Sequence, residues 1–98
     1  MIIIRNVFQL KFGKAREAVE LWRKGEALIQ KETKTKVRLL TDVTGQFYTL
    51  VLEMESKSLT DYERAQNATF GSAAWRAWYK KFSTLVKSGH REIFHVVD

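Results

Sequence analysis

Aromatic side chains are concentrated in the second half of the chain and are its strongest candidates for a ligand site. Tyr62 and Phe70 are followed by Trp75, Trp78 and Tyr79, the last three within five residues. Flat aromatic side chains can line an apolar cavity, and indole N–H and phenol O–H groups can anchor a ligand there. An aromatic stripe at helical spacing is more often ordinary core, and composition does not separate the two roles.

Glu26 is a carboxylate at an unexpected position. At about 100° per residue on a helix, it falls in the apolar arc one turn beyond Trp22. It either faces a pocket or lies in water where the helix extends past the sheet. We favour the second interpretation, because unpaired buried carboxylates are rare.

The two histidines, His90 and His95, are five residues apart. On one strand this odd spacing places them on opposite faces, so they do not bind one metal ion together. We expect neither a metal site nor a cofactor, although either histidine alone could be an axial haem ligand. A lone histidine is more often structural. As acid–base groups, the histidines could act with any of four side chains, Tyr48, Asp42, Arg38 or Glu26, and spacing does not choose among these combinations.

Composition excludes several kinds of chemistry. The chain of 98 residues has no cysteine, which excludes disulfides, thiolate catalysis and cysteine–metal sites. No glycine-rich phosphate loop, HExxH, GxSxG or Walker sequence occurs. The net charge of +6 comes from basic residues that are spread from Arg5 to Arg91, which is typical of a solvated surface.

No apolar stretch is long enough to span a membrane, and no basic segment characteristic of a signal peptide follows Met1. We therefore expect a cytoplasmic protein with no membrane partner.

Apolar periodicity predicts the elements that must position these side chains. Strands are predicted at Ile2–Leu10, Lys36–Val43, Gln46–Met54 and His90–Val97, and a helix at Lys14–Glu32. A second helical segment begins after Ser58, a candidate N-cap, breaks at Asn67–Gly71 and resumes at Ser72–Lys87. Gly89 is predicted to end that last helix.

The order β-α-β-β-α-β, with the second α broken in two, predicts an α+β ferredoxin-like fold for a single domain over residues 1–98. Right-handed crossovers place the helices on one face of a four-stranded antiparallel sheet. The first and third strands become central, and the more polar second strand lies at an edge.

The stretch Gln46–Met54 is apolar on both faces, with Phe47 and Val51 on one and Tyr48, Leu50 and Leu52 on the other. Helices can cover only one of these faces. The other would leave an exposed apolar patch, which marks an interface. We expect a second copy to cover it, sheet against sheet, in a two-fold homodimer.

The RNA-recognition motif shares this element order. Its function needs exposed aromatic side chains on the sheet for base stacking. Ile3 stands where the first strand of that family carries an aromatic residue, and GQFYTLVL lacks a basic-Gly-aromatic opening. We do not expect a nucleic-acid partner.

The stretches VFQLKFGKAREAVELW, TDVTGQFYTLVLEMES with SLTDYE, and WRAWYKKFSTLVKSGHREIF resemble the dimeric α+β barrel superfamily, and more closely its NIPSNAP-like small proteins. The resemblance implies a homodimer and a cavity between sheet and helices in each subunit. Other branches of the superfamily include cofactor-independent monooxygenases, haem-dependent enzymes and small-molecule-binding or stress-related proteins. No catalytic signature is part of the resemblance.

Three hypotheses follow. The leading one is a homodimer that binds an apolar or aromatic small molecule in the helix–sheet cavity. Candidate pocket residues are Tyr62, Trp75, Trp78, Tyr79, Tyr48, Glu26 and His95. The second is an enzyme of the monooxygenase or isomerase type, and the third is a structural or interaction module whose cavity is filled. The sequence names neither a ligand nor a reaction, and it leaves open whether the protein is an enzyme.

Overall fold

The two strands with the most apolar sequences lie in the centre of the sheet. The computed structural model describes residues 1–33 and 35–98. The elements follow the order β1 (Ile2–Leu10), α1 (Ala15–Thr33), β2 (Val37–Thr41), β3 (Thr49–Ser56), α2 (Leu59–Phe70), α3 (Ala73–Ser83) and β4 (Val86–His95). The strands form one antiparallel sheet in the order β2-β3-β1-β4.

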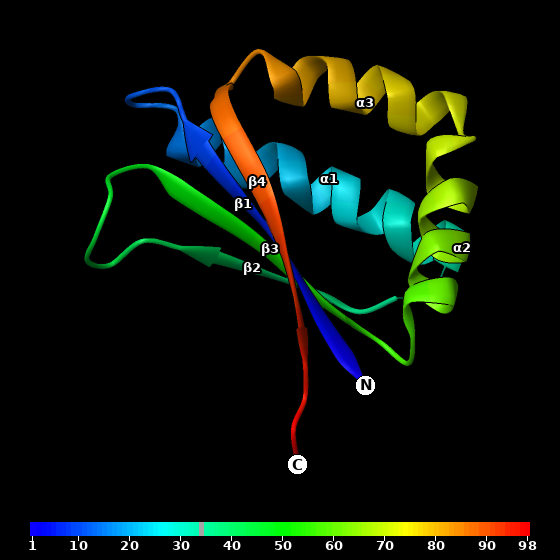
Figure 1. Ribbon diagram of the computed structural model, residues 1–98. Coiled ribbons are helices and arrows are strands. Elements are labelled where there is room, and N and C mark those ends of the chain that lie inside the picture. Colours follow the sequence, from blue (N-terminus) through cyan, green and yellow to red (C-terminus); the bar gives the residue numbers. More distant parts are fainter. Residues whose placement is uncertain (34) are drawn as a thin grey trace.

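All three helices cover the same face of the sheet, and the two chain ends lie near each other at one end of it (Figure 1). This arrangement confirms the predicted ferredoxin-like fold with its second helical segment divided into α2 and α3. None of the helices described is long and apolar enough to cross a membrane.

Serine side chains begin both helices of the divided segment. Ser58 Oγ accepts a hydrogen bond from Asp61 N at 3.1 Å, as the sequence predicted, and Ser72 Oγ accepts one from Trp75 N at 3.3 Å. Each bond satisfies one of the backbone N–H groups that a helix start leaves without a partner. The short break at Gly71 and Ser72 therefore turns the chain from α2 into α3.

Tryptophans hold α3 against α1. The rings of Trp22 and Trp78 lie 4.3 Å apart, centroid to centroid, in an edge-on arrangement, and the Trp78 indole N–H donates to the Leu21 carbonyl at 2.6 Å. Gly25 makes this contact possible, because a Cβ there would lie 2.5 Å from Trp78 Cζ2. The helix thus contains a glycine in its interior where the neighbouring indole leaves no room for a side chain.

Several element ends differ from the predictions. α3 ends at Ser83 and not at Lys87, because the chain from Val86 onward pairs with β1. Gly89 consequently lies within β4 opposite Phe8, where a Cβ would come within 3.0 Å of the Phe8 ring. α2 continues through the predicted break at Asn67 as far as Phe70.

The start of β3 also differs. It begins at Thr49 and not at Gln46, because Tyr48 has a positive φ of 58°, which interrupts an extended strand. Phe47 therefore lies in the preceding loop and is exposed.

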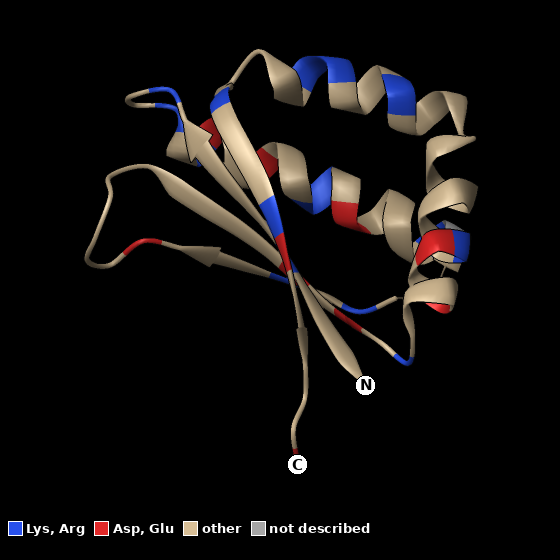
Figure 2. Ribbon diagram, in the orientation of Figure 1, with Lys and Arg blue, Asp and Glu red and all other residues tan. Residues whose placement is uncertain are grey.

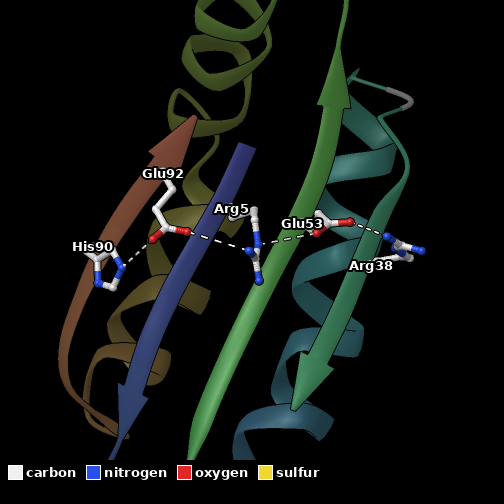
Figure 3. A network of polar contacts seen from close by, with 5 residues as sticks. All are labelled: Arg5, Arg38, Glu53, His90 and Glu92. Carbon is white, nitrogen blue, oxygen red and sulfur yellow. Dashed lines mark hydrogen bonds and ion pairs between the residues drawn. The ribbon is translucent and has the colours of Figure 1, made fainter. Parts of the chain in front are cut away.

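The face of the sheet opposite the helices, here called the open face, carries a row of charged side chains (Figure 3). Arg38 pairs with Glu53, Glu53 with Arg5 at 3.6 Å, Arg5 with Glu92 at 3.9 Å, and Glu92 with His90 at 3.4 Å. The register places Arg38, Glu53, Arg5 and Glu92 side by side across all four strands. The sequence interpretation, which stressed the apolar residues of this face, did not predict the row.

Replacing Gly25 by Ala tests the packing of α3 on α1. Alanine favours a helix by about 1 kcal/mol over glycine, but its methyl group would clash with Trp78. We expect Gly25→Ala to lower the free energy of unfolding by about 1–2 kcal/mol, measured by urea denaturation.

The matched control repeats the change in a Trp78→Phe background, where the smaller ring leaves space. There Gly25→Ala should be neutral or stabilising. If Gly25→Ala raised the free energy of unfolding in the protein that retains Trp78, this result would contradict the proposed role of Gly25.

Candidate functional site

A cavity of about 830 Å³ lies between the helices and the sheet. Its walls come from the second half of α1, from α2 and α3, and from the helix-covered sides of β1, β3 and β4. The lining residues are Asn6, Phe8, Trp22, Ile29, Thr33, Thr35, Leu52, Met54, Tyr62, Ala65, Gln66, Thr69, Phe70, Trp75, Arg76, Tyr79, Lys80, Val86, Ser88, Gly89, His90 and Arg91.

Aromatic rings make one wall of this cavity. Trp75 is stacked with Phe70 at a centroid distance of 6.1 Å and lies 6.3 Å from Tyr79. Trp75 and Trp22 are almost completely buried, whereas Phe70 and Tyr79 are about half exposed. The wall therefore extends from the core to the surface and presents flat apolar rings along its length.

Polar side chains converge on another part of the cavity, between β1, β4 and α2. Asn6 and Arg91 are direct partners on β1 and β4, and Arg91 Nε donates to Asn6 Oδ1 at 2.7 Å. Gln66 on α2, with its amide oriented to satisfy its neighbours, accepts from Arg91 Nη2 at 3.0 Å. The Arg91 guanidinium also lies 5.7 Å from the centre of the Tyr62 ring, a distance typical of a cation–π contact.

Two buried polar groups lie at this site. Burial raises the pKa of the Tyr62 phenol above its ordinary value of 10.0, and the nearby Arg91 charge opposes this shift in part. Tyr62 is therefore a neutral phenol at physiological pH. Trp22 Nε1 is buried and has no hydrogen-bond partner among the described residues, which marks it as a donor open to an additional acceptor.

The structure brings three of the predicted pocket residues together. Tyr62, Trp75 and Tyr79 line the cavity, whereas Trp78 lies behind its wall, bound to the Leu21 carbonyl. Tyr48 lies instead beside Phe12, with ring centroids 4.6 Å apart, in a second and shallower hollow at the far end of α1.

Glu26 and His95 lie outside both hollows. Glu26 is half-buried and accepts a hydrogen bond from Gln30 at 3.5 Å on the surface of α1, which fits the expectation that it lies near water. His95 is exposed at the end of β4. Among the described residues, no three His, Asp or Glu side chains are grouped to hold a metal ion.

Sequence reasoning missed the polar wall. Asn6 gave a detectable signal, because the other helix-facing residues of β1 are Ile2, Ile4, Phe8 and Leu10. A polar residue in such a row needs a hydrogen-bond partner. Arg91 and Gln66 gave no comparable signal, since each resembles an ordinary surface residue until the fold brings them together.

Replacing Tyr62 by Phe tests the burial of its phenol. Above pH 10 the unfolded chain releases this proton while the folded chain retains it, so its contribution to stability is present below pH 10 and lost as the pH rises through the folded pKa. We expect unfolding free energies of the unmodified protein to fall more steeply above pH 10 than those of Tyr62→Phe, measured by urea denaturation between pH 7 and the alkaline limit of folding. Parallel curves would contradict this assignment.

Comparison with known proteins agrees with this architecture. A NIPSNAP domain protein from Burkholderia xenovorans has a TM-score of 0.90 at 12% identity, covering 99% of this chain and 95% of its own. A NIPSNAP family protein from Agrobacterium tumefaciens has a TM-score of 0.91 at 19% identity, covering 99% of this chain and 86% of its own. A cofactor-independent oxygenase from Streptomyces nogalater has a TM-score of 0.76 at 12% identity, covering 99% and 93%.

At these identities the structural matches establish a shared fold, which extends to antibiotic biosynthesis monooxygenase-like proteins. A search of curated protein sequences found no match. The sequence model of the NIPSNAP family, in contrast, matches residues 4–98, nearly the entire chain. The protein belongs to the NIPSNAP family.

Proposed function

We propose that this protein binds a flat apolar or aromatic small molecule in the cavity between its helices and its sheet, and that it does so as a homodimer. The observation that supports binding most directly is that aromatic rings border the cavity and that two of them, Phe70 and Tyr79, are about half exposed. Exposed aromatic rings beside a cavity give a ligand a flat apolar surface.

The dimensions and polarity of the cavity fit a small molecule. Ligand pockets typically enclose about 300–1,000 Å³ and combine apolar walls with a few placed polar groups. The cavity of about 830 Å³ has this character, with aromatic rings on one side and the Asn6–Arg91–Gln66 group on the other. A structural module with a filled cavity is less consistent with this geometry.

An enzyme of the monooxygenase or isomerase type remains the second candidate, in line with the fold shared with the Streptomyces nogalater oxygenase. General acid–base catalysis requires groups that exchange protons near neutral pH. The polar wall instead consists of two amides, Asn6 and Gln66, and the guanidinium of Arg91. These groups are suited to orienting a ligand, which is why we place binding first.

The open face supports the homodimer. Its charged row lies between two apolar groups, formed by Val7, Val51 and Leu40 on one side and by Ile3 and Phe94 on the other. Packing against the same face of a second copy would remove these side chains from water. Alternating charges in the row allow opposite charges to meet across a two-fold axis, which would favour one register.

Filling the cavity tests ligand binding. Ala65 on α2 lines the cavity, and Ala65→Phe would place a ring in the space. We expect it to weaken binding of the neutral fluorescent probe N-phenyl-1-naphthylamine by about tenfold or more, which corresponds to about 1.4 kcal/mol.

The control is Ala68→Phe, which adds the same ring on an exposed position of α2 outside the cavity. It should leave probe affinity unchanged. Equal affinity in both variants, with intact circular dichroism, would show that the probe binds elsewhere.

A charge on the open face tests the dimer. We expect the unmodified protein to sediment with the mass of two chains at micromolar concentration. Val7→Glu, which buries a carboxylate at the proposed interface, should shift it to one chain. Ala27→Glu on the exposed side of α1 should not. A monomeric unmodified protein would contradict the proposal.

A further inference from the structure

The cavity has an asymmetric charge. Its described lining contains Arg76, Lys80, His90 and Arg91 and includes no aspartate or glutamate. The His90 side chain lies 3.4 Å from Glu92 on the open face. The other three side chains, Arg76, Lys80 and Arg91, are cations, and no carboxylate in the described lining matches them.

Among these cations, Arg91 is held in position by neighbouring side chains. It faces the helices from β4, opposite Asn6, and its side-chain contacts are the amides of Asn6 and Gln66 and the ring of Tyr62. None of these groups carries a negative charge, and among the described residues no carboxylate lies within ion-pair distance of Arg91. A guanidinium has five N–H donors in a planar fork, so this anchored side chain retains donors for an anion.

Two more cations border the same cavity on α3. Arg76 is held by the Phe70 and Gly71 carbonyls, at 3.4 and 3.3 Å, and Lys80 follows one turn later. Figure 2 shows basic and no acidic segments along α3. The positive potential at the cavity therefore has contributions from both of its walls.

We propose that the ligand of this cavity is an aromatic anion, whose ring system lies against Phe70 and Tyr79 and whose carboxylate, sulfonate or phosphate is bound by Arg91. This inference rests on the proposed function and adds the charge of the ligand to it. Anion binding by the remaining N–H donors of the guanidinium and ring packing on Phe70 and Tyr79 would act on different parts of one molecule. The two walls of the cavity provide these two interactions.

A pair of probes that differ by one sulfonate tests the inference. 1-Anilinonaphthalene-8-sulfonate carries the anion, and N-phenyl-1-naphthylamine is its neutral counterpart. We expect the protein to bind the sulfonate probe about tenfold more tightly at low salt, and this preference to shrink as salt screens the Arg91 charge. This comparison uses the unmodified protein and does not depend on a variant that folds.

Substitutions test whether Arg91 causes the preference for the sulfonate probe. Arg91→Gln should remove the preference for the sulfonate probe, while Arg91→Lys should retain part of it. Arg64→Gln is the matched control, because Arg64 lies on α2 outside the cavity and pairs with Asp61. Arg64→Gln should keep the full preference for the sulfonate probe. Ala65→Phe should weaken the binding of both probes.

The outcomes separate this inference from the proposed function. Equal affinity of the unmodified protein for the two probes, or a preference that Arg91→Gln leaves intact, would overturn the anion assignment while ligand binding stands. Failure of both probes to bind would overturn ligand binding in the cavity, and the anion assignment with it.

Discussion

The contact between Trp78 and Gly25 determines how much of the sheet the helices can cover. It holds α3 against α1, and the Trp78 indole is fixed there by its bond to the Leu21 carbonyl. With α3 in this position, the helices do not close over β4, whose residues are mostly exposed. The space between α2, α3 and β4 is the cavity, so the site results from the same packing that stabilises the core. A glycine in mid-helix is unfavourable by about 1 kcal/mol, which the burial of two tryptophans readily offsets.

The two faces of the sheet differ in how their polar side chains are paired. On the helix-covered face, Asn6 and Arg91 form one polar pair within an apolar surface. On the open face, Arg5 lies between Glu53 and Glu92, so opposite charges alternate across the strands. Exposed ion pairs contribute little stability individually. If a second copy removed water from this row, the free-energy cost of desolvating its charges would be large unless every charge were paired. In this row each of the four charges, on Arg38, Glu53, Arg5 and Glu92, has an opposite charge beside it.

Much of the fold was predictable, because the spacing of apolar residues in the sequence agrees with which residues are buried in the structure. The two-sided apolar pattern placed β1 and β3 at the centre, and Ser58 marked the start of α2 correctly. The errors occurred where tertiary contacts override local pattern. Gly89 ends no helix, because the chain from Val86 onward pairs with β1. Its missing Cβ gives room for the Phe8 ring across the sheet. Within the site, aromatic rings were found from their spacing. The polar wall joins residues far apart in the chain, and no single-sequence period can predict that juxtaposition.

Asn6 is a polar residue in the helix-facing row of β1, where apolar packing is expected. An amide among isoleucines and a phenylalanine is unfavourable unless it is hydrogen-bonded, and its partner Arg91 brings a further charge without bringing a carboxylate. Arg91 is exposed on β4, and two amides hold its guanidinium beside the aromatic side of the cavity. Under the proposed function, donors held in place in this way would reduce the entropy lost when a ligand binds.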